Sequence, residues 1–451
     1  MAYQIDTQEG YSATTVKILE EMKEDIKNGL MPIQVFNNPD IYKLELRRIF
    51  ARTWVFIGHE TEIPSPGDYA IRKIGEDPFI FVRDENGQIQ VLFDSCRHRG
   101  VKLCRSDMGN TSHFRCPYHG WTYKNSGDLV GVPAKHKGYR ELNEEDWGLL
   151  KAPQVANYCG LIFACLDPKA PSFEEYLGSY KWYFDIQFKL TDGGMEVIGE
   201  PHRWLVDANW KQGAENFCGD SSHTPMTHRS TIQVGIVTET QAGTPNEANG
   251  FHVNDCDGHN ISIRQYAAGS NSFFGYPEEV KKHFRKGELS DEQFAMAERA
   301  ILHDGTLFPN FSFIQIGLKD DIDEPEVGFL SIRTWQPAGP GKAEIWNWIL
   351  APKEASEAYK QRAYRAGMSS FSPSGSFEQD DVAVWSGIAQ SASTVFAEMN
   401  RMKLNYQMSM GSMGDKKPLE DWAGPGEAWA SSVGEAGLRC FHRTWYKWMM
   451  E

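Results

Sequence analysis

The amino-terminal part of the chain places apolar and polar residues with the spacing of amphipathic helices. In residues 11–30 apolar side chains recur every three or four positions, which puts them on one face of a helix. Ser12 or Thr14 can cap the first turn, because a hydroxyl accepts a hydrogen bond from a free amide at a helix start. A second helix is predicted over residues 40–51.

From residue 55 to about residue 166 the pattern changes to short runs rich in β-branched and aromatic residues. Turn sequences such as Ser65-Pro-Gly and Glu85-Asn-Gly separate these runs. A series of short strands joined by tight turns predicts a small all-β domain. The expected strands cover residues 55–58, 69–74, 79–83, 89–93 and 160–166.

After a linker at residues 167–171, longer strand-like runs alternate with helical ones. We expect strands at 196–206, 251–266 and 327–350, and helices at 210–223, 291–302, 353–367 and 380–404 and near the carboxyl terminus. The predicted fold class is α+β: a β-rich domain is inserted into a larger α+β domain whose antiparallel sheet is flanked by helices. The expected boundaries are 1–40 for the helical start of the larger domain, 41–170 for the β-rich domain and 171–451 for the remainder.

Composition and charge exclude several classes of function. The 451 residues include 46 Lys and Arg against 61 Asp and Glu, a net charge of −15 that disfavours binding to nucleic acid. No apolar run approaches the roughly 18–20 residues of a membrane helix, and the first ten residues do not read as a secretory signal. The eight cysteines are too sparse for a disulfide scaffold. We therefore expect a cytoplasmic protein with no membrane or nucleic-acid partner.

Two short segments of the β-rich domain each supply one cysteine and one histidine. They are Cys96-Arg-His98 and Cys116-Pro-Tyr-His119. A Rieske 2Fe–2S cluster requires this set, with two thiolates on one iron and two imidazoles on the other. A structural zinc site could use the same residues, but zinc fingers usually group their cysteines and their histidines separately. The interleaved order favours the Rieske cluster.

The neighbours of these pairs suit two tight loops. Gly100 and Gly120 follow the pairs and permit close approach of the backbone, and Pro117 stiffens the second loop. Trp121 and Tyr123 could shield a cluster from water.

A second group of potential ligands lies in residues 209–228, which begin with helical spacing. Asp220 and His223 are three positions apart and would share one helix face. His223 and His228 would diverge in a regular helix, but a break at Pro225 can bring both imidazoles together. Two histidines and a carboxylate are the ligands of a non-haem Fe(II) site that activates dioxygen. Taken alone these could be ordinary helix-face histidines; the accompanying electron-transfer cluster favours the iron site.

The third ligand must come from elsewhere in the chain. The candidate run is residues 371–381, where a loop rich in Gly, Pro and Ser meets a helix expected to begin near Asp381. An acidic residue there could instead be a helix N-terminal charge. Spacing alone leaves Glu378, Asp380 and Asp381 as alternatives.

Both groups together resemble the large (α) subunits of Rieske non-haem iron aromatic-ring-hydroxylating oxygenases, such as naphthalene, biphenyl and toluene dioxygenases. The resemblance spans roughly residues 35–400. Besides the Cys/His pairs, it rests on Glu-Asn-x-x-x-Asp-x-x-His-x-x-x-x-His from Glu215 to His228, and on Phe-Glu-x-Asp-Asp ending at Asp381. It makes 41–170 the Rieske domain and 171–451 the catalytic domain. The ligands it implies are Cys96, His98, Cys116 and His119 for the cluster, and His223, His228 and Asp381 for the mononuclear iron.

The resemblance also implies roles beside the iron. In this family the subunits form a ring, and Asp220 would bridge the two centres by accepting hydrogen bonds from His223 of its own chain and His119 of the next. Asn216 would lie close to the iron without clear ligation. The implied substrate pocket includes Phe217, Phe371, Phe377 and Met226.

The resemblance implies a terminal oxygenase that adds both atoms of O2 to an aromatic hydrocarbon, polycyclic or biaryl, to give a cis-dihydrodiol. The chain has no G-x-G-x-x-G fingerprint, so nicotinamide and flavin chemistry would reside on an NAD(P)H-dependent reductase, with a ferredoxin as the electron carrier. A chain of this length resembles members that associate with a small β subunit as an α3β3 hexamer.

Alternative functions remain at this point. An aromatic carboxylate of the benzoate, phthalate or salicylate type, di- or monohydroxylated, would need an arginine in the pocket, and Arg264, Arg299 and Arg333 are candidates. Monohydroxylation or demethylation of a polar aromatic is another alternative. A Rieske-type electron carrier without oxygenase activity would have no second metal. Residues 230–310, where substrate-gating loops are expected, diverge from the family pattern.

Overall fold

The computed structural model describes residues 12–237, 250–255, 257–284, 287–410, 418–430 and 434–451. Two compact units are found: Met1–Ile49 with Glu174–Glu451, and Phe50–Phe173. The β-rich unit thus begins after Ile49, whereas we expected it to begin at residue 41. The helix α2 (Pro39–Glu45), which buries Ile41 and Leu44, belongs to the larger unit.

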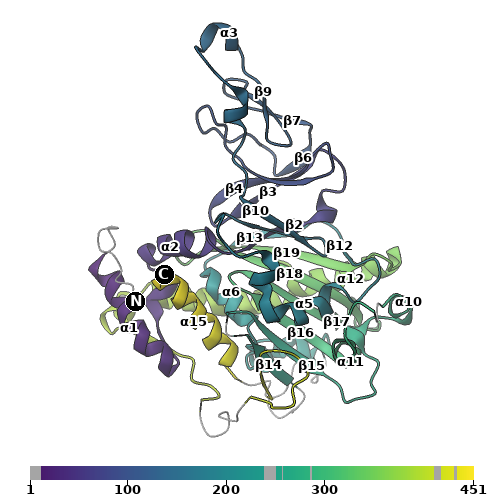
Figure 1. Cartoon of the computed structure of the whole chain (residues 1–451). Coiled ribbons are helices and arrows are strands. Elements are labelled where there is room, and N and C mark those ends of the chain that lie inside the picture. The colour runs from purple at the N-terminus through teal and green to yellow at the C-terminus, as the bar shows by residue number, and fades with distance from the viewer. Residues whose placement is uncertain (1–11, 238–249, 256, 285–286, 411–417, 431–433) are drawn as a thin grey trace. The chain divides into compact units, whose positions relative to one another are not determined.

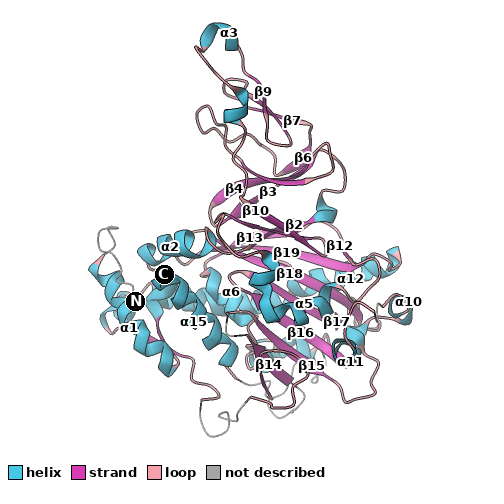
Figure 2. Ribbon diagram, in the orientation of Figure 1, coloured by secondary structure: helices cyan, strands magenta, loops and turns pink. Residues whose placement is uncertain are grey.

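The smaller unit consists of short antiparallel strands in three sheets (Figure 2). The sheets have the strand orders β10-β11-β2, β5-β4-β3-β6 and β7-β8-β9. All five expected strands are present, at β2, β3, β4, β5 and β11. The bounds are β2 (Val55–His59), β3 (Asp68–Ile74), β4 (Asp77–Arg83), β5 (Ile89–Phe93), β6 (Met108–Asn110), β7 (His113–Arg115), β8 (Thr122–Lys124), β9 (Leu129–Gly131), α3 (Lys135–Gly138), β10 (Gln154–Tyr158) and β11 (Leu161–Cys165).

The larger unit is built on a nine-stranded antiparallel sheet (Figure 1). Its order is β12-β19-β18-β17-β16-β15-β14-β21, and β13 also pairs with β19. This confirms the predicted antiparallel sheet flanked by helices. The strands are β12 (Met195–Val197), β13 (His202–Val206), β14 (Gly250–Asn254), β15 (Asn260–Gln265), β16 (Ala300–Leu307), β17 (Phe311–Leu318), β18 (Val327–Pro337), β19 (Ala343–Pro352) and β21 (Glu427–Trp429); a separate pair joins β1 (Leu30–Pro32) to β20 (Lys403–Asn405).

Helices pack on both faces of this sheet, so every residue of β18 and β19 is buried. Besides α2, the helices of the larger unit are α1 (Ala13–Asp25), α4 (Phe173–Leu177), α5 (Lys181–Phe188), α6 (Trp210–Asn216), α7 (Thr224–Thr227), α8 (Arg229–Gln233), α10 (Glu278–Lys281), α11 (Asp291–Arg299), α12 (Glu357–Phe371), α13 (Ser376–Ala392), α14 (Val395–Met399) and α15 (Ala436–Met450). On one face α6 lies so close that a Cβ added at Gly213 would be 2.2 Å from the Trp335 ring, and at Gly367 of α12 it would be 2.6 Å from Ile349. These two glycines let the helices that carry the site approach the sheet.

Some predicted elements differ in extent. The expected strand 196–206 is divided into β12 and β13, and the expected helix 210–223 ends at Asn216. The expected helix 291–302 ends at Arg299, where the chain enters β16, because tertiary pairing with β15 overrides local helical spacing. Ser12 caps α1, since its side chain accepts a hydrogen bond from the Thr15 amide.

His303 lies on the sheet face opposite α6 and gives a prediction about pH. It is fully buried, and its Nδ1 accepts a hydrogen bond of 2.7 Å from the Gln187 amide. Burial lowers the pKa of His303 to about 3. An unfolded chain takes up this proton near pH 6.5, so His303 destabilises the fold progressively as pH falls from about 6.5.

We expect His303→Gln to be less stable than the wild type at pH 7.5 yet less sensitive to acid. Between pH 6.5 and pH 4 the free energy of unfolding should fall less steeply in the variant than in the wild type. The difference in slope should be up to about 1.4 kcal/mol per pH unit, which corresponds to one proton. Urea unfolding at several pH values measures this difference. Parallel curves for the two proteins would show that His303 does not titrate as proposed.

Within the described ranges, no helix is both long and apolar enough to cross a membrane. The cysteines of the described residues form no disulfide bond.

Candidate metal centres and the cavity beside them

In the smaller unit, the two Cys/His pairs lie on loops of the same geometry. The Gly100 amide donates to the Cys96 carbonyl at 2.8 Å, and the Gly120 amide donates to the Cys116 carbonyl at 3.0 Å. Both glycines have left-handed φ angles, 72° and 73°. Other residues rarely adopt this conformation, so glycine at these two positions lets each loop close behind its cysteine.

These loops bring the four predicted cluster ligands together. Cys96 and Cys116 are buried, and their thiols are close enough to hydrogen-bond. The rings of His98 and His119 lie 4.7 Å apart between centroids. The Nδ1 atoms of both imidazoles are buried and find no hydrogen-bond partner among the described residues. A buried ring nitrogen without a partner is costly, so the arrangement fits a cluster held by two thiolates and two imidazole nitrogens.

Aromatic side chains cover this group, as the sequence suggests. The Trp121 ring stacks on His98 with 8° between the planes, and the Tyr123 hydroxyl lies 3.4 Å from Cys96 Sγ. Burial lowers the pKa of His98, with smaller effects in the same direction from His119 and Arg99. The imidazole is therefore neutral near pH 7, as a metal ligand must be.

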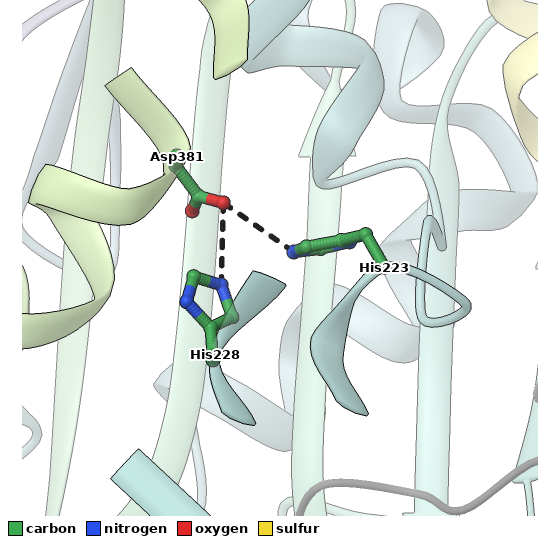
Figure 3. Close-up of side chains that lie close together, drawn as sticks. All are labelled: His223, His228 and Asp381. Carbon is green, nitrogen blue, oxygen red and sulfur yellow. Dashed lines mark ion pairs between the residues drawn. The ribbon is translucent and has the colours of Figure 1, made fainter. Parts of the chain in front are cut away.

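In the larger unit, His223 and His228 flank the short helix α7 (Figure 3). Their ring centroids are 5.2 Å apart. The predicted proximity is present, but the bend lies elsewhere than expected. The helix α6 already ends at Asn216, and Pro225 lies in the first turn of α7, where its missing amide costs no hydrogen bond.

Asp381 supplies the carboxylate that points at both imidazoles (Figure 3). Its Oδ1 lies 3.5 Å from His223 Nε2 and 3.2 Å from His228 Nε2. Helix α13 begins at Ser376, not near Asp381 as expected, so Asp381 lies in the second turn and is buried. Two imidazole nitrogens and a carboxylate oxygen converge here and fit the ligand set of a non-haem Fe(II) site.

The other two acidic candidates have different partners. Asp380 Oδ2 lies 3.4 Å from His228 Nδ1, so Asp380 can orient that imidazole from behind. Glu378 is buried and accepts a 2.8 Å hydrogen bond from Arg333. The geometry therefore separates three acidic residues that spacing alone left equivalent.

Asp220 lies beside His223, as the resemblance implies. Its Oδ2 is 3.6 Å from His223 Nδ1, its Oδ1 accepts a 3.1 Å hydrogen bond from Ser222, and its backbone carbonyl accepts a hydrogen bond from His223 Nδ1. Burial alone would raise the pKa of Asp220, but the hydrogen bond and charge of His223 lower it overall. For His223, burial is outweighed by Asp220 and Asp381, which raise its pKa to about 9. The carboxylate and the imidazole are thus electrostatically coupled.

A cavity opens beside the histidines and Asp381. Three of the four predicted pocket residues line it, and so does Asn216. Met226 does not line it: its side chain is 79 % exposed, because it lies on the outer side of the single turn α7. The lining residues are Asn216, Phe217, Asp220, Ser221, His223, Thr224, His228, Val237, Arg264, Leu302, Asp304, Ile314, Ile316, Phe371, Phe377 and Asp381.

The three arginine candidates have different positions. Arg264 is buried and lines the cavity. Arg333 is paired with Glu378, and Arg299 hydrogen-bonds the Ala295 carbonyl at the end of α11. Neither Arg299 nor Arg333 lines the cavity. Arg264 is therefore the arginine of the three that a substrate could meet.

Sequence reasoning missed the cavity side chains of β16 and β17. Strand β16 lies in the segment 230–310 that diverges from the family pattern, and its first residues belong to the expected helix 291–302. The alternation of Leu302 with Asp304, and of Ile314 with Ile316, was the available signal, since residues two apart point to one face of a strand. Residues 238–249, also in that segment, lie outside the described residues.

Comparison with known proteins agrees with both units. Residues 53–158 match the Rieske [2Fe-2S] domain, and residues 173–451 match the catalytic domain of the ring hydroxylating alpha subunit. The chain is 38% identical to the N,N-dimethyl phenylurea N-demethylase subunit alpha of Sphingobium sp. (strain YBL2), covering 95% of this chain and 94% of the relative. It is 36% identical to the biphenyl 2,3-dioxygenase subunit alpha of Rhodococcus jostii (strain RHA1), covering 81% and 78%.

A solved structure extends this likeness to three dimensions. Naphthalene 1,2-dioxygenase from Rhodococcus sp. bound to indole has a TM-score of 0.91 and 40% sequence identity, covering 97% of this chain and 99% of that one. Both domains, in the same order, therefore have close counterparts of known architecture. The chain belongs to the α subunits of Rieske ring-hydroxylating dioxygenases, terminal oxygenases that carry a 2Fe–2S cluster and a mononuclear iron.

Proposed function

We propose that this subunit holds an aromatic ring beside the mononuclear iron so that both atoms of O2 are added to it, giving a cis-dihydrodiol. The observation that carries this proposal is the cavity that opens on His223, His228 and Asp381. When bound by these three residues, iron supplies dioxygen activation, and the cluster on Cys96, His98, Cys116 and His119 supplies electrons.

Aromatic side chains of the cavity would orient the ring. Phe377 packs edge-on against His228 with centroids 4.8 Å apart, and Phe371 stacks on Phe377 at 5.4 Å. Planar arenes bind such walls by area burial and by face or edge contacts. These two rings therefore decide which edge of the substrate faces the iron ligands.

Removing either of these two rings should change the position at which the substrate ring is oxidised. We expect Phe371→Ala or Phe377→Ala to alter the ratio of regioisomeric diols from naphthalene or biphenyl by about fivefold, because a lost aromatic contact is worth roughly 1 kcal/mol. Chromatographic analysis of the products measures the ratio. Iron content should remain as in the wild type, and an unchanged product ratio in both variants would remove these residues from substrate orientation.

Partners follow from the place of an α subunit in a multicomponent enzyme. We expect association with a small β subunit as an α3β3 hexamer, and electrons from NAD(P)H through a reductase and a ferredoxin. Such donors place the reaction in the cytoplasm. Asp220 would then accept a hydrogen bond from His223 of its own chain and from His119 of the next chain, and would carry electronic coupling between the centres.

Product analysis with reduced donor proteins tests the proposed reaction. In a panel of benzene, naphthalene, biphenyl and benzoate, the arenes that the enzyme oxidises should give diols that contain two oxygen atoms from 18O2. Hydroxylated or dealkylated products with one labelled oxygen would contradict dioxygenation. An absence of any oxygenated product, in protein with full iron and cluster content, would contradict oxygenase function itself.

N-demethylation of a polar aromatic is a second candidate. The 38% identical relative is named for demethylation of an N,N-dimethyl phenylurea, and the cavity here contains Arg264 and Asp304. Formaldehyde release from N,N-dimethyl-N′-phenylurea would support this reaction, and its absence while naphthalene is dihydroxylated would exclude it. An aromatic carboxylate is less favoured, since Asp304 shares the cavity with the arginine that would bind it.

A further inference from the structure

The floor of the cavity is the sheet face formed by β15, β16 and β17. In the sheet register Asp304 lies opposite Ser262 on one side and Ile314 on the other, and Leu302 lies opposite Arg264 and Ile316. Paired residues of neighbouring strands point to the same face. The floor therefore has a polar side, on β15 and β16, and an apolar side towards β17.

Charge on the polar side is confined to a small area. Arg264 is 4% exposed, and Asp304 is partly buried; both side chains line the cavity. Burial raises the pKa of Asp304 to about 7, while Arg264, a hydrogen bond from Ser262 and His223 act to lower it. Ser262 is itself 3.2 Å from Ser221 between hydroxyl oxygens. A carboxylate and a guanidinium thus share one edge of the cavity, opposite the apolar side chains of Ile314 and Ile316.

An unsubstituted hydrocarbon satisfies this edge poorly. If it filled the cavity, it would displace water from the Asp304 carboxylate without replacing the lost hydrogen bonds, which is costly. An aromatic carboxylate would approach Arg264 but would meet the like charge of Asp304. A neutral substituent with an N–H donor beside a carbonyl acceptor complements both groups.

We propose that Asp304, assisted by Arg264, is a specificity-determining residue that accepts a hydrogen bond from an N–H group of the substrate. The substrate class is then a neutral arene with an anilide or phenylurea group. Its ring lies on the apolar side, against Ile314, Ile316 and the Phe371–Phe377 wall. This assignment rests on the proposed function, because it presumes that the cavity binds the substrate.

Three ligands of similar length distinguish an N–H donor, an apolar group and a charged group at this position. Acetanilide carries the N–H group, phenylacetone replaces that group with CH2, and phenylacetate carries a charge. Calorimetric titration of the oxidised enzyme, with iron, cluster and β subunit present, measures binding without turnover; at pH 8.5 Asp304, with a pKa of about 7, is ionised. We expect acetanilide to bind about 10- to 100-fold more tightly than phenylacetone, the effect of one hydrogen bond to a charged group.

Variants assign this preference to the carboxylate. Asp304→Leu should bring the acetanilide-to-phenylacetone ratio close to one. Asp304→Asn keeps the size of the side chain and removes its charge, so it should bind phenylacetate at least about tenfold more tightly than the wild type does. As a control, Asp207→Asn changes a carboxylate whose side chain is 81% exposed and should keep both wild-type preferences.

A ratio near one in the wild type, or an unchanged ratio in Asp304→Leu, would overturn the assignment. If Asp304→Leu fails to fold, Asp304→Asn still tests the assignment, because an unchanged affinity for phenylacetate in that variant would overturn it. Oxidation of acetanilide and of naphthalene by the wild type is measured separately: absence of oxygenated product from both overturns the proposed reaction, whereas a product without the acetanilide preference overturns only the role of Asp304.

Discussion

Replacing Asp381 with alanine should remove the mononuclear iron and leave the Rieske cluster in place. The carboxylate is the sole oxygen ligand of the converging group, with Oδ1 within 3.5 Å of both imidazole Nε2 atoms. Two histidines alone hold Fe(II) weakly, so we expect iron to fall from about three to about two atoms per chain and turnover to fall below about 1%. Metal analysis together with the Rieske absorption spectrum measures both centres.

The adjacent residue provides a matched control. Asp380 lies behind His228, 3.4 Å from its Nδ1, so Asp380→Ala should keep the iron but bind it about 10- to 100-fold more weakly. Loss of iron from Asp380→Ala with retention in Asp381→Ala would reverse the assignment. Both substitutions lie on α13 and remove the same group, so a difference between them cannot come from helix propensity.

For Asp220→Ala we expect both metal centres to remain while turnover falls by about 100-fold or more. Iron should stay because His223 Nδ1 can still donate to the backbone carbonyl of residue 220, which keeps the imidazole oriented. The lost carboxylate is the group that couples electrostatically to His223. Rapid mixing of the fully reduced enzyme with O2 and substrate should therefore show slow reoxidation of the cluster.

Ser222→Ala is the control for this experiment. It removes only the hydroxyl that donates to Asp220 Oδ1, so reoxidation should slow by less than about tenfold. Iron loss in Asp220→Ala would indicate that Asp220 is a ligand. Reoxidation at the wild-type rate would show that the carboxylate has no part in coupling the centres.

Local residue spacing was sufficient to predict the features that lie within one short segment of the chain. The Cys/His pairs lie on two loops, and each loop closes on its own cysteine through a glycine amide, so sequence order alone brings each pair together. The cap at Ser12 and the strands of the β-rich unit were predictable for the same reason. The family follows from such motifs, because the ligands of each centre must recur at nearly constant spacing.

Features that depend on contacts between distant segments could not be predicted from local spacing. Glu378, Asp380 and Asp381 are equivalent by spacing, and only the start of α13 and its packing direct Asp381 at the histidines and Glu378 at Arg333. Met226 is adjacent to the site in sequence yet points outward.

The polar edge of the cavity shows the reason most clearly. Asp304 and Arg264 are forty residues apart, and strand register brings them onto one face of the sheet. A shift of one residue in either strand would turn that side chain to the opposite face. Ligands within a loop are positioned by local backbone geometry, whereas pocket walls depend on the pairing of whole strands, which only the folded chain defines.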